Sequence, residues 1–168
     1  MTDPVLDQTV TSPTPSLVWR NPWHFLAFGL GSGTMRKAPG TWGSLIALPF
    51  MPLWLMLPQW GYGLMLATTM VFGCWLCGRV ARDLGVHDHE GIVWDEMVGM
   101  WITLWLVPAI WYWWLLGFAL FRLFDIFKPW PISWLDRNVA GGVGIMIDDI
   151  VAGLCAWAAL QAIMMAVA

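Results

Sequence analysis

Long stretches without any charged residue are the feature that most constrains how this chain can fold. Residues 38–78 are 41 consecutive positions without Asp, Glu, Lys or Arg, residues 97–121 are another 25, and residues 150–168 are a third such run. The chain is 59% hydrophobic with 15 Trp and only 11% charged, whereas soluble domains are about 25% charged. A helix of about 20 apolar residues crosses a bilayer core. We therefore predict an all-α, polytopic membrane bundle.

The length of 168 residues is enough for one compact domain. Residues 1–20 are polar and proline-rich and are predicted to be a flexible tail, while residues 21–168 are predicted to form a single membrane-embedded domain. Eight basic residues and a net charge of -3 exclude a nucleic-acid surface on so apolar a chain. Membrane lipids are the expected surroundings, and the sequence leaves the oligomeric state open.

Proline and glycine residues divide the apolar runs into about five helices, with one further short helix expected at the membrane surface. The predicted helices cover residues 23–30, 42–57, 62–78, 92–107, 111–127 and 150–168. Pro49 and Pro52 are expected to distort the second of these.

Pro108 lies in the middle of segment 92–127, which is too long for one span. We predict a helical hairpin with its turn at residues 108–110, and a kinked single span is the alternative. The hairpin places all eight basic residues on one membrane face or in its surface zone. The positive-inside bias makes that face cytoplasmic. The single span would move Arg122, Lys128 and Arg137 to the other face.

Two glycine-rich stretches, residues 29–43 and 140–144, are predicted to be loops. The backbone N–H groups of the first can cradle a phosphate, with Arg36 and Lys37 as counter-charges. The alternative is a flexible loop whose basic residues only mark the cytoplasmic side. Thr41 is the predicted N-cap of the helix that follows.

Acidic residues gather at the ends of the uncharged runs. An ionised carboxylate near hydrocarbon loses its hydration at a cost of several kcal/mol, unless a partner or a metal replaces the water. Two adjacent acids in a first helical turn are favourable for the helix dipole, but this effect does not account for a pair flanked by Ile on both sides. With the hairpin, three acidic sets converge on one face: Asp88, Glu90, Asp95 and Glu96; Asp125; and Asp148 and Asp149.

Crowded carboxylates need a cation, and sites made only of oxygen ligands suit Mg²⁺ or Mn²⁺ better than zinc. The same face carries basic residues that can stabilise charge on a phosphoryl group. At the lipid–water boundary, the natural substrate for such a site is a phosphorylated lipid headgroup. The basic residues are Lys37, Arg79, Arg82, Arg122 and Lys128.

The rival hypothesis is a small divalent-cation transporter or channel subunit, in which acids line a path through the membrane. Such a path needs polar residues near mid-membrane. Segments 42–57 and 97–107 offer only Ser44 and Thr103. The sequence therefore favours an enzyme.

Four blocks of sequence, in this order, resemble the bacterial phosphatidylglycerophosphatase A family: G-S-G-T-M-R-K-A-P-G-T-W-G-S, G-V-H-D-H-E-G-I-V-W-D-E-M-V-G-M-W, F-R-L-F-D-I-F-K-P-W-P-I and G-G-V-G-I-M-I-D-D-I-V-A-G. The resemblance covers about residues 21–155. It implies an enzyme of the bacterial inner membrane. Together with the multi-pass hairpin topology and the positive-inside bias, this predicts an active site that faces the cytoplasm. The implied reaction is the Mg²⁺-dependent hydrolysis of phosphatidylglycerophosphate, a phosphorylated glycerolipid, to phosphatidylglycerol.

The resemblance also implies the site residues. The family's basic positions fall on Lys37, Arg122 and Lys128, and we expect Arg36 to join them at the substrate phosphate. The sequence leaves open which acid activates water and whether an Asp attacks phosphorus covalently. The predicted catalytic residues are Asp88, Asp95, Glu96, Asp125 and Asp149. The predicted metal ligands are Asp95, Glu96, Asp125, Asp148 and Asp149.

Overall fold

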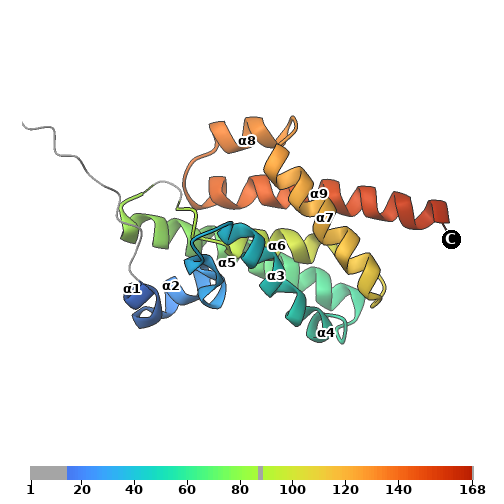
Figure 1. Cartoon of the computed structure of the whole chain (residues 1–168), viewed down its shortest axis with the longest axis horizontal. Helices are drawn as coiled ribbons and strands as arrows, with labels where there is room; N and C mark the ends of the chain where they lie inside the picture. The colour runs from blue at the N-terminus through green and yellow to red at the C-terminus, as the bar shows by residue number, and fades with distance from the viewer. Residues whose placement is uncertain (1–14, 87–88, 168) are drawn as a thin grey trace, which may run out of the picture.

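The computed structural model describes residues 15–86 and 89–167, and all regular structure within these ranges is helical. Figure 1 shows the arrangement of the helices. In chain order they are α1 Pro15–Arg20, α2 Pro22–Ala27, the 3-10 turn η1 Gly29–Thr34, α3 Pro39–Ala47, the 3-10 turn η2 Leu48–Phe50, α4 Met51–Trp54, α5 Gln59–Leu84, α6 Trp94–Thr103, α7 Trp111–Phe127, α8 Ile132–Asn138 and α9 Gly141–Val167.

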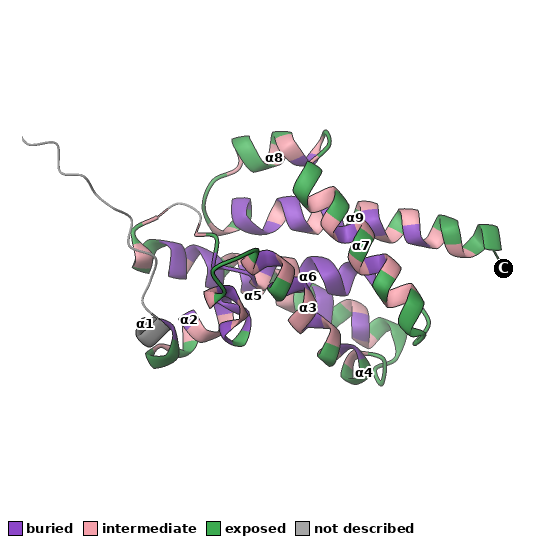
Figure 2. Cartoon of the chain, viewed as in Figure 1, coloured by how far each residue is buried: buried purple, intermediate pink, exposed green. Residues whose placement is uncertain are grey.

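Helices α6 and α9 form the centre of the fold. Every residue of α6 from Met97 to Thr103 is buried (Figure 2). Helix α9 packs against α5, α6, α7 and α8. The backbones approach closely where both helices carry glycine, because a Cβ atom at Gly153 would lie 2.6 Å from the carbonyl oxygen of Gly99. Small residues at a crossing permit this kind of contact.

The hairpin prediction is confirmed. Helix α6 ends at Thr103, the chain turns, and α7 starts at Trp111. The two helices are antiparallel: a Cβ at Gly99 would meet the ring of Phe121, and one at Gly117 would meet Leu104. Helix α6 ends four residues before the predicted position 107. Pro108 disfavours helical backbone angles at residue 107, which precedes it. The turn between the two helices begins before that residue, so α6 ends earlier than predicted.

Of the described helices, α5 and α9 are long and apolar enough to cross a membrane. The predicted count of about five apolar helices is not confirmed. Pro49 and Pro52 divide the expected helix 42–57 into α3, η2 and α4, since proline removes a backbone hydrogen bond and clashes with the preceding turn. The C-terminal part of α9 extends beyond its neighbours with exposed apolar side chains such as Met165 (Figure 1). Exposed apolar surface of this extent fits a membrane-associated protein.

The last residues of the predicted N-terminal tail are helical in the structure. Residues 15–20 form α1, and Val18 is fully buried. The preceding part of the predicted tail, residues 1–14, lies outside the described residues.

The first glycine-rich stretch is not one loop. Pro39 takes the first position of α3, where its fixed φ angle suits a helix, and Ala38 before it has a left-handed φ of 50°. Thr41 therefore lies inside the helix and is not its N-cap. Gly40 and Gly43 belong to the buried face of α3.

The second glycine-rich stretch is also helical, contrary to the prediction of a loop at 140–144. Helix α9 begins at Gly141, which has a φ of 73°. The glycines that follow serve close packing, because a Cβ at Gly142 would lie 1.8 Å from the carbonyl oxygen of Cys74. Asp148 and Asp149 thus lie about two turns inside α9 rather than in its first turn. The helix dipole does not explain their presence there.

Candidate active site

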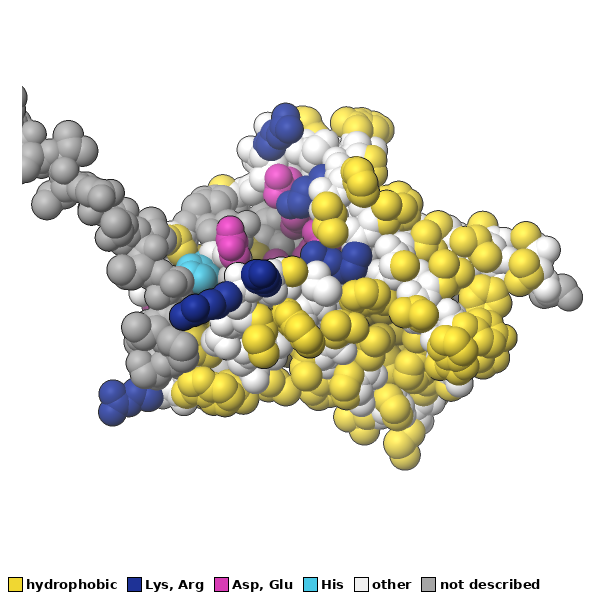
Figure 3. Space-filling model, in the orientation of Figure 1, with side chains coloured by type: hydrophobic (Ala, Val, Ile, Leu, Met, Phe, Trp, Pro, Cys, Tyr) yellow, Lys and Arg dark blue, Asp and Glu magenta, His cyan; other side chains and the backbone are white. Residues whose placement is uncertain are grey.

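Three carboxylates from two helices meet at the N-terminal end of α6. Asp95 and Glu96 come from its first turn and Asp149 comes from α9, and each offers an oxygen atom within 4.8 Å of the others. We call these three residues the carboxylate cluster. Asp95 is only 8% exposed and Asp149 only 4%. Figure 3 shows acidic side chains in a hollow bordered by Lys and Arg side chains, beside a broad hydrophobic surface.

The cluster contains oxygen atoms that the described part of the chain does not satisfy. Oε2 of Glu96 and Oδ1 of Asp149 are buried and have no hydrogen-bond partner among the described residues. Each buried acceptor left in this state costs about 1–3 kcal/mol, and more when it is charged. Converging carboxylates with free lone pairs are the donor set of a divalent cation that binds oxygen. The residues present therefore fit Mg²⁺.

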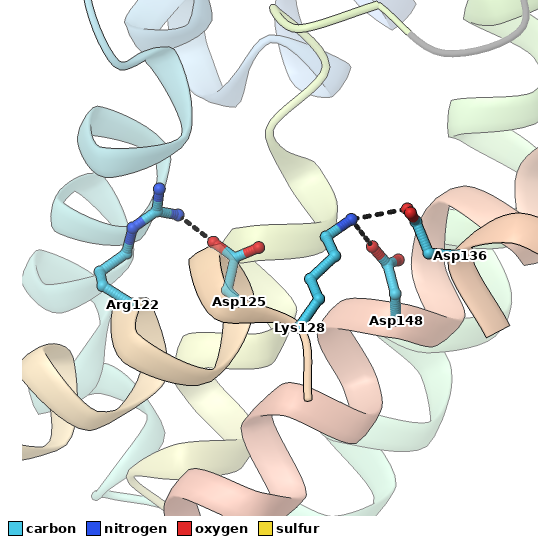
Figure 4. A network of polar contacts seen from close by, with 5 residues as sticks. All are labelled: Arg122, Asp125, Lys128, Asp136 and Asp148. Carbon is cyan, nitrogen blue, oxygen red and sulfur yellow. Dashed lines mark hydrogen bonds and ion pairs between the residues drawn. The ribbon is translucent and has the colours of Figure 1, made fainter. Parts of the chain in front are cut away.

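Arg122 and Asp125 stand beside the cluster on α7. They form an ion pair one helical turn apart (Figure 4), with side chains only 16% and 13% exposed. The Asp125 carboxyl also lies close enough to Asp149 for the charges of the two carboxylates to interact. Asp125 therefore links the arginine to the carboxylate cluster.

The N-terminus of α3 closes the side of the site where Glu96 and Arg122 lie. A Cβ atom at Gly40 would lie 2.2 Å from Oε1 of Glu96 and 3.1 Å from Nη1 of Arg122. Only glycine leaves room for both side chains against this helix end. The sequence predicted a glycine-rich loop at Gly40 and did not indicate this contact.

Lys128 is the second basic residue of the site and lies in a left-handed conformation at the C-cap of α7. Its Nζ donates hydrogen bonds to Oδ1 of Asp136 at 2.6 Å and to Oδ2 of Asp148 at 2.7 Å (Figure 4). Partial burial lowers the pKa of Lys128, but the hydrogen bonds to the two carboxylates outweigh it and raise that pKa above its ordinary value. The ammonium group therefore stays charged.

Asp136 was not among the predicted site residues. Asp136 lies eight residues from Lys128 and on a different helix, so helical spacing does not reveal the pair. The only sequence signal for this pairing was the segment from Pro129 to Pro131, whose prolines must turn the chain back over α9.

The other predicted residues do not join the cluster. Arg36 and Lys37 are exposed between η1 and α3, and neither forms an ion pair within the described ranges. Arg79 instead pairs with Asp83 and lies over the rings of Trp23 and Trp75. Glu90 is exposed. Asp88 lies outside the described residues.

The fold and the site together define an all-helical, membrane-associated protein whose buried carboxylates are flanked by fixed cationic side chains. Residues 25–164 match the family model described as phosphatidylglycerophosphatase A. The chain belongs to the phosphatidylglycerophosphatase A family, and the prediction of an enzyme, a phosphatase acting on phospholipid, is confirmed.

Two relatives show how far the similarity extends. The chain is 56% identical over 135 residues to phosphatidylglycerophosphatase A of Escherichia coli, covering 80% of this chain and 78% of that protein. It is 45% identical over 150 residues to phosphatidylglycerophosphatase A of Haemophilus influenzae, covering 88% and 92%. No solved structure matches the chain.

Proposed function

We propose that this protein hydrolyses the phosphate monoester of phosphatidylglycerophosphate to phosphatidylglycerol and inorganic phosphate, with Mg²⁺ as its cofactor. The substrate is that named for the relatives from Escherichia coli and Haemophilus influenzae. The observation that carries the proposal is the carboxylate cluster with its unsatisfied oxygens, placed next to Arg122 and Lys128.

Asp95, Glu96 and Asp149 would hold the cation, and Asp125 is close enough to Asp149 to support it. A bound Mg²⁺ would polarise the phosphoryl oxygens and offset their negative charge. Asp148 is a weaker candidate than the sequence suggested, because its Oδ2 already accepts a hydrogen bond from Lys128.

The basic residues are positioned to bind the phosphate. Lys128 has three donor hydrogens, of which the carboxylates of Asp136 and Asp148 use two, and the third can reach a phosphate oxygen. Asp125 fixes one end of the Arg122 guanidinium and leaves its other N–H groups for the substrate. Both residues stabilise charge on the phosphoryl group as water attacks.

Hydrolysis replaces the bond between phosphorus and the glycerol oxygen by a bond to the oxygen of water. A carboxylate of the cluster accepts the proton that water loses, and the departing glycerol oxygen gains a proton to become a hydroxyl group. Asp95, Glu96 and Asp149 are the candidates for this base. Burial of the cluster excludes bulk water and strengthens each of these electrostatic contacts.

The proposed location is the bacterial inner membrane, with the site facing the cytoplasm. Support comes from the two candidate spanning helices, from the exposed apolar surface and from the positive-inside bias. The transporter alternative has no support from the comparisons. Thr103, one of its two mid-membrane polar residues, uses its hydroxyl to bond the Gly99 carbonyl oxygen.

The test is release of phosphate from phosphatidylglycerophosphate in mixed detergent micelles by the purified protein. We expect activity with Mg²⁺, loss of activity in EDTA, and recovery when Mg²⁺ is added back, while a zinc-selective chelator has no effect. Full activity after exhaustive chelation would contradict the metal assignment. Absence of phosphate release under all metal conditions would contradict the function itself.

A further inference from the structure

An open pocket of about 460 Å³ lies on the side of α3 that faces away from the carboxylate cluster. The end of α1, the turn η1 and the outer face of α3 form its walls. The Trp19 ring lies against Gly31, where a Cβ atom would be 3.1 Å from it. The apolar side chains that line the pocket are Trp19, Leu30, Met35, Trp42, Leu45 and Ile46.

The chemistry of the pocket suits one end of an amphiphile. Its volume falls in the usual range of small-molecule sites, which are mostly apolar. Exposed basic residues follow two of the lining residues directly: Arg20 follows Trp19, and Arg36 and Lys37 follow Met35. An apolar recess with a cationic border matches a hydrocarbon chain attached to an anionic headgroup.

Helix α3 connects the pocket to the active site. Its buried face, which includes Gly40 and Gly43, packs against the α6 side of the site. Trp42 and Ile46 lie about 200° and 240° around the helix from Gly40 and therefore face the opposite side. Gly40 and Ile46 are separated by about 9 Å along the helix axis at 1.5 Å per residue. One lipid molecule can therefore extend from the pocket, across the α3 N-terminus, to Glu96 and Arg122.

We propose that this pocket holds an acyl chain of the anionic phospholipid substrate, with Arg36 and Lys37 contacting its backbone phosphate while the terminal phosphate reaches the carboxylate cluster. The proposal rests on the proposed function for the identity of the substrate. It gives Arg36 and Lys37 a role at the lipid's inner phosphate, consistent with their exposed position outside the cluster.

The first test compares a long-chain substrate with a dihexanoyl analogue below its micellar concentration. The variant Ile46→Trp fills the pocket, and Trp42→Ala removes part of its wall without disturbing the buried face of α3. Each should raise KM for the long-chain substrate about tenfold, the effect of roughly two methylene groups losing apolar contact. Neither variant should change kcat. For the dihexanoyl analogue, kcat/KM of each variant should stay within about twofold of the wild-type value. Leu154→Trp on the exposed side of α9 is the matched control and should behave like the wild type.

The second test does not need turnover. A phosphatidylglycerol with a photoreactive diazirine on its acyl chain should cross-link to α3 and η1 in the wild type, and less in Ile46→Trp. Cross-links elsewhere only, or equal losses on the long-chain and short-chain substrates, would overturn the pocket assignment. If wild type cleaves neither substrate but cross-links in the pocket, the proposed function fails, and with it the identity of the lipid as substrate.

Discussion

Asp148 and Asp149 are adjacent on α9, yet their carboxyl groups meet different partners. Oδ2 of Asp148 accepts a hydrogen bond from Lys128 at 2.7 Å, whereas Asp149 lies within 4.8 Å of the Asp95 and Glu96 oxygens. Consecutive helical residues point about 100° apart, so the two adjacent acids reach two different groups: Asp148 reaches Lys128, and Asp149 belongs to the carboxylate cluster. One of them holds the cationic side chain in place, and the other contributes to the proposed metal site.

Asp149→Asn should abolish most of the activity and leave the fold intact. The amide keeps the shape of the side chain but removes the charge that the cation requires. Loss of residues that merely support metal ligands costs about 10–100-fold, so loss of a ligand should cost at least about 100-fold in kcat. Phosphate release measures the effect, and circular dichroism in detergent confirms folding.

Glu90→Gln is the control for this variant, because Glu90 is another acid that the sequence assigned to the same membrane face, but its side chain is exposed. It should retain wild-type activity. Near-normal turnover of Asp149→Asn, beside a fully active Glu90→Gln, would remove Asp149 from the site.

Lys128 and Asp148 should be energetically coupled. In a double-mutant cycle of Lys128→Met and Asp148→Asn, thermal unfolding in detergent should give a coupling free energy of about 0.5–3 kcal/mol. Lys128→Met should be the more destabilising single change, since it leaves the buried Asp148 carboxylate without its cation. The cycle with Asp136→Asn should give less than about 1 kcal/mol, because Asp136 is 38% exposed and solvent screens the pair. Equal coupling in both cycles would contradict this assignment.

Gly40→Ala should impair catalysis more than folding. The added Cβ would lie 2.2 Å from Oε1 of Glu96, the movable end of a side chain, so the carboxylate shifts and the backbone does not have to. Misplacement of a catalytic group by about 1 Å can cost about 10²-fold in rate. We expect a loss of this order in kcat with a nearly unchanged unfolding temperature.

Gly63→Ala provides the comparison, because a Cβ atom there meets nothing within 4 Å. Alanine in a helix interior is more favourable than glycine by about 0.5–1 kcal/mol, so this variant should be active and slightly more stable. If Gly40→Ala were as active as Gly63→Ala, the α3 N-terminus would have no part in positioning Glu96.

The acids and the hairpin could be predicted because both leave local signals in the sequence. Charges are rare in so apolar a chain, so Asp95, Glu96, Asp125 and Asp149 were conspicuous. Pro108 interrupts a run too long for one span, which indicated a turn. Neither inference needed the packing of distant elements.

The errors arose where tertiary packing decides what a residue does. Glycine and proline favour loops locally, but Pro39 starts α3 and Gly142 permits contact with the Cys74 carbonyl oxygen inside the bundle. The pairing of Lys128 with Asp136 likewise depends on how α8 folds back. No spacing rule within a single helix contains this information.

The topology of the hairpin can be tested with two exposed alanines that lie in connections at opposite ends of the α7 region, Ala109 and Ala140. In a background where Cys74, Cys77 and Cys155 are replaced by Ser, each alanine is changed to Cys. Helix α7 packs along α9, which is long and apolar enough to cross a membrane, so we expect the two ends of α7 to lie toward opposite membrane faces. An impermeant maleimide added outside intact spheroplasts should label Ala109→Cys. It should label Ala140→Cys only after permeabilisation, because that connection adjoins the site that we propose to face the cytoplasm. Labelling of Ala140→Cys from outside, in a variant that still releases phosphate, would place the carboxylate cluster on the periplasmic face.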